Sequence, residues 1–364
     1  MLQKNWLLKD FDKDRVIEMS KKFKISPLTA IILYNRGISE DEEIYNFLNC
    51  DVSRMHDPYL MKDMDKAIER ILRAKENAET VTIYGDYDVD GITSIAILYK
   101  HLTELGMKVN YYIPDRMQEG YGVNTSALDK IKEWGSSLII TVDTGITAVE
   151  ETEYAKSIGL DIIITDHHEC KDKIPNAYAA IDPKRKDCPY PFKNLAGVGV
   201  AFKLIQALDV SVPLPELMEK YADLMCLGTV ADISPLVDEN RLIVIEGLRR
   251  FQDTKNVGLR ALIDVCTNKK AITTSTIGYI IAPRINASGR LGCASRSVEL
   301  FLTDDSKKAA ELADDLCKEN TIRQQTEQRM FAEALEYIQE HPEMEEEKIL
   351  VIPHRNWHHG IVGI

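Results

Sequence analysis

Residues 82–91 read Thr82-Ile83-Tyr84-Gly85-Asp86-Tyr87-Asp88-Val89-Asp90-Gly91. An apolar strand, 81–84, leads into three aspartates at every second position, and Gly91 is predicted to open a helix, 92–104. Side chains two residues apart in extended backbone share one face, so the three carboxylates are expected to converge. Close carboxylates repel one another unless a cation or protons lie between them, and Mg²⁺ and Mn²⁺ favour carboxylate oxygens. The stretch therefore predicts a metal site, with an acidic turn after an edge strand as the alternative.

Length and composition narrow the class of protein. The 364 residues suffice for two or three domains, and 45% hydrophobic and 28% charged residues are ordinary for a soluble globular protein. No apolar run reaches the ~20 residues of a membrane span, and the N-terminus lacks the apolar core of a signal peptide. The net charge of −13 argues against a protein coated with basic surface, although a local basic groove can still hold phosphates.

The cysteines are scattered singly, with no close pair in the sequence. An odd set without a pattern predicts reduced thiols in a cytoplasmic protein rather than a disulfide framework or a zinc site. The seven are Cys50, Cys170, Cys188, Cys226, Cys266, Cys293 and Cys317.

Repeated strand–loop–helix units begin at about residue 80, after a helical segment that carries no evident chemistry. Strands alternating with helices predict an α/β fold with a parallel sheet wrapped by helices on both faces. The predicted strands are 81–84, 109–113, 138–142 and 161–165, and the helices between them are 93–105, 125–134 and 146–157.

Acids or histidines follow three of these strands. The first leads to the three aspartates, the third ends Val142-Asp143-Thr144-Gly145, and the fourth ends Thr165-Asp166-His167-His168. In open parallel sheets, ligands bind beyond the carboxyl ends of the strands. Three such strand ends together predict a functional site rather than a chance placement.

Two later stretches add candidates. Asp232 ends an apolar helix, 215–228, and is either a site acid or a cap of the helix terminus. Residues 283–291 read Pro283-Arg284-Ile285-Asn286-Ala287-Ser288-Gly289-Arg290-Leu291. Arginine forks match phosphate geometry, so this stretch predicts an anion clamp, with a structural loop that bridges acidic neighbours as the alternative.

The last 61 residues are predicted to contain one long helix, 304–341, stopped by Pro342, and a new strand, 349–352. The chain then stops too soon for a further domain, so we expect it to be cut off within one. The predicted division is a helical N-terminal cap (1–75), a catalytic domain (76–303), a long connecting helix (304–342) and the truncated start of a second α/β lobe (343–364).

Taken together, these motifs resemble the RecJ branch of the DHH phosphoesterase superfamily, which are bacterial single-strand-specific exonucleases. The resemblance spans nearly the whole sequence, and six ordered motifs carry it. They are 85–91, Val142-Asp143-Thr144-Gly145, Asp166-His167-His168, Thr229-Val230-Ala231-Asp232, 283–291 and Trp357-His358-His359-Gly360-Ile361-Val362-Gly363-Ile364.

The resemblance implies two metal ions, Mn²⁺ or Mg²⁺, in the first of two lobes. One metal would be held by Asp90, Asp143, His167 and Asp232. Asp88 and Asp143 would hold the other with help from Asp86, so that Asp143 bridges. Small relatives carry a histidine where this sequence has Tyr84. Asp143, His167 and His168 would be the catalytic residues.

The resemblance also implies phosphate contacts, from His168, Arg116, Arg284, Asn286, Ser288 and Arg290. Trp357 would stack on a base or lie in the core. His358 and His359 would line the cleft and contact phosphate or base, bind metal, or be structural.

The implied activity is hydrolysis of single-stranded DNA from 5′ to 3′, releasing mononucleotides, in DNA repair and recombination. A helicase and a single-strand-binding protein are the implied partners. The first alternative is a DHH phosphodiesterase that acts on short oligonucleotides or cyclic dinucleotides. The second is a non-catalytic replication or repair scaffold.

Overall fold

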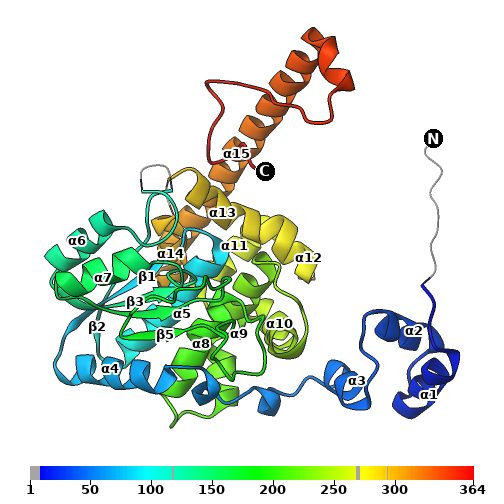
Figure 1. The fold of residues 1–364 in the computed structure, drawn as a ribbon, viewed down its shortest axis with the longest axis horizontal. Coiled ribbons are helices and arrows are strands. Elements are labelled where there is room, and N and C mark those ends of the chain that lie inside the picture. The colour runs from blue at the N-terminus through cyan, green and yellow to red at the C-terminus, as the bar shows by residue number, and fades with distance from the viewer. Residues whose placement is uncertain (1–8, 117–118, 268–270, 293) are drawn as a thin grey trace.

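A five-stranded parallel sheet forms the centre of the computed structural model, which describes residues 9–116, 119–267, 271–292 and 294–364. Helices cover both of its faces (Figure 1). Along the sheet the order is β2 (Lys108–Tyr112), β1 (Thr80–Gly85), β3 (Ser136–Val142), β4 (Asp161–Thr165) and β5 (Ala179–Ile181). The predicted α/β fold is confirmed, and all four predicted strands are present. Strand β5 was not predicted, because its three residues are too few for a recognisable strand pattern.

Both faces of the sheet are buried, which explains the continuous apolar runs of its strands. Leu138 and Ile140 of β3 contribute to one hydrophobic core, while Ile139 between them contributes to the other. The first core also takes in α4 (Met64–Glu76), α5 (Val89–Glu104), α8 (Gly197–Leu208) and α9 (Leu214–Ala231). On the opposite face lie α6 (Thr125–Glu133) and α7 (Val149–Ser157).

The turn between β1 and α5 differs from the extended backbone expected for the three aspartates. The helix begins at Val89, because the Asp88 side chain caps it by accepting hydrogen bonds from the N–H groups of Asp90 (2.9 Å) and Gly91 (3.1 Å). Asp90 therefore lies in the first helical turn. A Cβ atom at Gly91 would lie 2.7 Å from the Asp86 carbonyl oxygen, so the tight turn requires glycine there.

The N-terminal helices have a small core of their own. Val16, Met19, Ala30, Leu33 and Ile44 form it. They lie on α1 (Lys13–Phe23), α2 (Pro27–Asn35) and α3 (Asp41–Leu48), which Figure 1 shows beside the main body. The next helix, α4, packs into the main core instead. The division of the chain into domains stays a prediction.

Residues 282–290 are helical, so the loop of the structural alternative is not formed, and the anion clamp stays a prediction. Pro283 is tolerated because it lies in the first turn of α13 (Ala282–Arg290), and the buried Ile285 and Ala287 hold the helix against the core. The neighbouring elements are α10 (Asp238–Phe251), α11 (Val257–Thr267), α12 (Thr274–Thr276), a π-helix (Ile277–Ile281) and α14 (Ser295–Leu302).

The predicted long helix is confirmed as α15 (Ser306–Glu340), which stands out from the body in Figure 1. A short 3₁₀ turn (Pro342–Glu346) follows it. The predicted strand at 349–352 is wrong: these residues form no strand. Their apolar side chains pack against little, since Ile349 and Val351 are 78% and 75% exposed, and a strand needs a partner to satisfy its backbone. The chain then returns to α13, where Arg290 Nη1 donates to the Gly360 carbonyl (2.9 Å).

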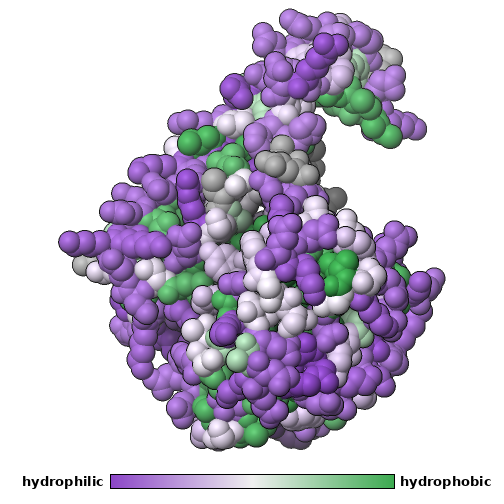
Figure 2. Space-filling view, turned by 90° about the vertical axis from the view of Figure 1, so that its left-hand side faces the viewer, coloured by the Kyte–Doolittle hydropathy of each residue, from purple (hydrophilic) through white to green (hydrophobic). Residues whose placement is uncertain are grey.

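The surface on the face shown in Figure 2 is mainly hydrophilic, with small separate hydrophobic patches. Among the described residues, no helix combines the length and the apolar character needed to cross a membrane. The cysteines among them are free thiols, as predicted, and Cys293 lies outside the described residues.

Acidification is expected to destabilise the protein through a histidine buried beneath α9. His101 Nδ1 lies 3.1 Å from the Tyr221 hydroxyl, and burial lowers the pKa of His101 to about 4. The unfolded chain, with a histidine pKa near 6.5, then binds the proton more readily, so stability is lost as pH falls below that value. Between neutral pH and about pH 5.5 the free energy of unfolding falls by about 1 kcal/mol.

Urea unfolding of wild type and His101→Gln at both pH values should give a smaller pH-dependent loss of stability for the variant. Equal losses would contradict the assignment.

Candidate metal centre

The site lies where the carboxyl ends of three neighbouring strands meet. Asp86 follows β1, Asp143 follows β3 and His167 follows β4. Since β1 lies between β2 and β3, the strand order reverses at the β1–β3 boundary, and the gap between these strand ends is where parallel sheets bind ligands. The topology thus brings together residues that are up to 81 positions apart in the sequence.

Potential metal-ligand atoms form groups within which they lie no more than 4.8 Å apart. The first group consists of Asp90, His167 and Asp232. The Nε2 atom of His167 lies 3.8 Å from Asp90 Oδ2 and 4.0 Å from Asp232 Oδ1. The second group consists of Asp86, Asp88 and Asp143. The three aspartates of residues 86–90 are therefore divided between these two groups, because Asp90 has turned onto α5.

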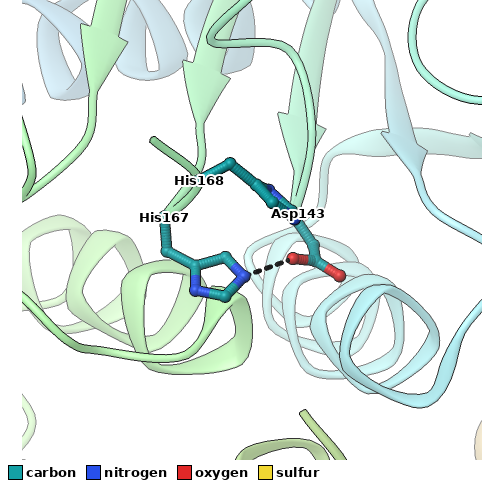
Figure 3. A group of neighbouring side chains, drawn as sticks. All are labelled: Asp143, His167 and His168. Atoms are coloured by element: carbon teal, nitrogen blue, oxygen red, sulfur yellow. Dashed lines mark ion pairs between the residues drawn. The ribbon is translucent and has the colours of Figure 1, made fainter. Parts of the chain in front are cut away.

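Asp143 connects the two groups. A third group, which consists of Asp143, His167 and His168, shares a residue with each of them. Asp143 Oδ1 lies 2.9 Å from His167 Nε2, and Figure 3 shows the two side chains pointing toward each other. This contact lacks hydrogen-bond geometry, and both atoms are buried without a hydrogen-bond partner among the described residues, a state that is rare for buried polar atoms. Carboxylate oxygens are ligands for Mn²⁺ and Mg²⁺, and neutral imidazole is a common ligand of metal ions in proteins, so the residues present fit a divalent cation.

Local backbone places Asp143 at the site. Its φ of +59° is in the left-handed region, which aspartate tolerates better than most residues. The first residue of α8 then approaches closely, since a Cβ atom at Gly197 would lie 2.7 Å from Asp143 Oδ1. Sequence reasoning missed Gly197, and the only signal available was its place at the start of an apolar helix.

Asp90 is held by the N-terminus of α8. Its Oδ2 accepts from the Gly197 N–H (2.7 Å) and its Oδ1 from the Val198 N–H (2.8 Å). The positive end of a helix stabilises a carboxylate in this position. Asp90 is thereby oriented from two sides, by its own helix and by α8.

Burial works against the charged forms of these residues. Burial raises the pKa of Asp86 to about 7, with a contribution from the charge of Asp88. Burial also raises the pKa of Asp88, and it raises the pKa values of Asp90 and Asp143 well above their usual range. The same burial lowers the pKa of His167, which keeps the imidazole neutral. Without a cation, then, this cluster does not stay fully ionised.

His168 lies beside the aspartates and is oriented by Asp166. The Nδ1 atom of His168 lies 2.7 Å from Asp166 Oδ1, and this hydrogen bond raises the pKa of His168 to about 9. Asp166 is buried and also accepts from the N–H groups of Ile146 (2.8 Å) and His167 (2.7 Å). Asp166 belongs to the Asp166-His167-His168 motif, but no role was predicted for it. On its other side, His168 Nε2 lies 3.3 Å from the Tyr121 hydroxyl.

Among the predicted phosphate contacts, three lie near the turn between β1 and α5. Arg116 stacks over the Tyr87 ring, 5.1 Å from its centroid. Asn286 Oδ1 accepts from the Val89 N–H (3.1 Å), so Asn286 braces the turn. Burial lowers the pKa of Arg290, whose neighbours include Arg116 and Asp88. Arg116 and Tyr87 also line a cavity of about 270 Å³.

Other predicted contacts lie elsewhere. Ser288 is fully buried and hydrogen-bonds Ser297 (2.8 Å) and the Ile285 carbonyl (2.7 Å). Arg284 donates to the Ile280 carbonyl and lies beside Cys317. None of these partners belongs to the metal-ligand groups.

The aromatic and histidine residues near the C-terminus also lie outside these groups. Trp357 donates to Glu333 Oε2 (2.8 Å) on α15 and stacks on His354, 5.0 Å between ring centroids. His358 Nδ1 accepts from the Gly360 N–H (3.1 Å), and His359 is exposed. The structure thus brings the acids and His167 together, whereas Trp357 contacts Glu333 and His354 instead.

Comparison with known proteins places this fold in a class. The model of the "DHH family, N-terminal domain" matches residues 80–229, which hold the sheet and six of the seven residues of the metal-ligand groups. The single-stranded-DNA-specific exonuclease RecJ of Bacillus subtilis (strain 168) is 43% identical over 360 residues, which are 99% of this chain and 45% of that protein.

Comparison with solved structures indicates the same class of protein as the sequence relatives. The crystal structure of RecJ from Thermus thermophilus in complex with Mn²⁺ matches with a TM-score of 0.83 and 31% identity, over 98% of this chain and 50% of that one. The crystal structure of exonuclease RecJ bound to manganese matches with a TM-score of 0.75 and 36% identity, over 83% of this chain and 76% of that one. The chain belongs to the RecJ family. It spans about half the length of the Bacillus subtilis and Thermus thermophilus relatives.

Proposed function

We propose that the protein hydrolyses the phosphodiester bonds of single-stranded DNA in a metal-dependent reaction, from 5′ to 3′, releasing 5′-mononucleotides. The observation that carries the proposal is the pair of acid-rich ligand groups joined by Asp143 at the strand ends. The names of the relatives support the choice of substrate, and membership of the RecJ family supports a place in DNA repair and recombination.

The residues fit two divalent cations. Asp90, His167 and Asp232 would hold one and Asp86, Asp88 and Asp143 the other, with Asp143 between them. Relatives solved with Mn²⁺ and with Mg²⁺ support either ion. A bound cation pair supplies a nucleophile at neutral pH and offsets the charge that develops on the phosphoryl group.

The chain's own residues position the substrate around that centre. Asp166 orients His168, whose Nε2 lies beside the Tyr121 hydroxyl and donates to a phosphoryl oxygen of the substrate. Arg116 and Arg290 bring positive charge close to the β1–α5 turn and attract the phosphate backbone. Asn286 keeps that turn in place through the Val89 N–H.

Location and partners follow from the same proposal. We place the protein in the cytoplasm, where free thiols such as its six described cysteines persist. A helicase would supply the single strands, and a single-strand-binding protein would keep them extended. Both partners are testable by adding each purified protein to the degradation assay and measuring the change in initial rate.

End-labelled DNA tests the proposed activity. The purified protein with Mn²⁺ should release the 5′ label of a single strand as mononucleotide in the first turnovers, while a 3′ label stays in long fragments. EDTA should abolish the release of the 5′ label, and a blunt duplex of the same sequence, which should survive, is the substrate control.

The other outcomes discriminate between the alternatives. Survival of long strands with hydrolysis of dinucleotides or cyclic dinucleotides would move the function to the short-oligonucleotide branch. Absence of all hydrolysis, together with failure to bind Mn²⁺ in calorimetry, would favour the scaffold. Release of the 3′ label first would overturn the polarity.

A further inference from the structure

Two cysteines that are 51 positions apart in the sequence meet at the base of the long helix. Cys266 lies near the end of α11 and Cys317 in the first third of α15, and their sulfur atoms are 3.9 Å apart. Both side chains are partly exposed, so small solutes reach them. A disulfide bond is ~2.05 Å long, so a relative shift of about 2 Å would allow the sulfurs to bond.

An arginine completes this cluster. Arg284, on α13, lies beside Cys317, and its Nε is buried without a hydrogen-bond partner among the described residues. The hydrogen bond shared with Cys266 and the neighbouring Arg284 guanidinium together lower the pKa of Cys317 to about 6. The same shared hydrogen bond raises the pKa of Cys266, so Cys266 keeps its proton. The pair thus joins a thiolate to a thiol, which is how a nucleophilic and a resolving cysteine are arranged.

We propose that Cys266 and Cys317 form a peroxide-reactive dithiol that closes reversibly to a disulfide between α11 and α15. The Cys317 sulfur attacks one oxygen of hydrogen peroxide, the O–O bond breaks, and the other oxygen leaves as hydroxide and takes up a proton to become water. Cys317 is then a sulfenic acid. The Cys266 sulfur attacks the Cys317 sulfur, the S–O bond breaks, and the Cys266 proton leaves with the hydroxyl group as a second water. Two thiols are oxidised and one peroxide is reduced.

A disulfide between Cys266 and Cys317 would affect the helices around it. Arg284 shares α13 with Asn286, which braces the turn that carries Asp88 and Asp90. Closing the disulfide removes the negative partner of Arg284 and fixes α15 covalently to α11. The proposal goes beyond the proposed function and does not depend on it, because the sulfur chemistry is measured directly.

Peptide mass spectrometry tests the proposal. The purified protein is treated with equimolar hydrogen peroxide at neutral pH, remaining thiols are blocked with N-ethylmaleimide, and the protein is digested without reductant. We expect a linked peptide pair containing Cys266 and Cys317, and full reversal of the link by dithiothreitol. Both thiols should stop reacting with N-ethylmaleimide at least about tenfold faster than the partly exposed Cys50.

Three variants make the test specific. Cys266→Ser should leave a sulfenic acid on Cys317 that dimedone traps, without any disulfide. Arg284→Gln should slow the oxidation of Cys317 severalfold, because the thiolate loses its cationic neighbour. Cys50→Ser, the matched control, should oxidise like wild type. Oxidation of Cys317 at the rate of Cys50, or a disulfide that joins other cysteines first, would overturn the proposal.

Discussion

Replacing Asp143 with asparagine is expected to reduce the hydrolysis of single-stranded DNA by about a thousandfold or more, because a metal contributes several kcal/mol to the transition state and each ~1.4 kcal/mol is tenfold in rate. The asparagine would keep the size of the side chain and tolerate the φ of +59°. It would lose the charged oxygen that connects the two ligand groups. The effect should therefore fall on catalysis rather than on folding.

Thermal unfolding separates these two effects. Burial raises the pKa of Asp143 well above its usual range, so a neutral amide relieves repulsion and the metal-free variant should unfold at a higher temperature than metal-free wild type. Added Mn²⁺ should raise the midpoint of wild type more than that of the variant. The exposed Asp172→Asn is the matched control and should match wild type in both assays. Near-normal hydrolysis by Asp143→Asn would contradict the assignment of Asp143 as the residue that connects the two ligand groups.

Alanine at Gly197 is expected to lower the rate of hydrolysis by about a hundredfold, since a displacement of about 1 Å in a catalytic group has that effect. Its Cβ atom would lie 2.7 Å from Asp143 Oδ1 and 2.8 Å from Asp143 Cβ, so either Asp143 or the start of α8 must move. Movement of α8 would also lengthen the 2.7 Å hydrogen bond from the Gly197 N–H to Asp90. Both ligand groups would change at once.

The same helix offers a control. A Cβ atom at Gly199 would meet the end of the Leu195 side chain at 3.0 Å, and a flexible leucine can give way by a few tenths of an ångström. Gly199→Ala should therefore hydrolyse DNA at close to the wild-type rate. Initial rates at saturating Mn²⁺, with circular dichroism to confirm folding, measure both variants. If the two alanines have equal effects, crowding of Asp143 is not the cause.

The sheet was predictable because its strands are buried on both faces, and most of the candidate site acids were predictable because they follow those strands. The division of Asp86, Asp88 and Asp90 was not predictable from alternation alone. It depends on the Asp88 side chain capping α5. Asp232 has features of both predicted alternatives: it follows α9 as the C-cap residue, and its Oδ1 lies 4.0 Å from His167 Nε2.

Tertiary contacts account for what sequence reasoning missed. Pro283 and Gly289 are typical of a loop, yet the burial of Ile285 holds the segment as a helix. Residues 349–352 have the composition of a strand but lack a partner strand within the described chain. The contact between Cys266 and Cys317 depends on the packing of α11 against α15, which no local pattern in the sequence records.

Because α15 is long and is packed mainly at one end, a small tilt at that end moves the other end a long way. Its 35 residues span roughly 50 Å at 1.5 Å per residue, while four of its six buried residues lie within its first 14 positions. A tilt of about 10° at that base would move the far end by roughly 9 Å, from the length of the helix alone. Ala309 and Ala313, both fully buried there, set how closely the helix approaches the body. One added methyl group at either position would therefore tilt the helix and displace its far end by a distance much larger than the methyl group.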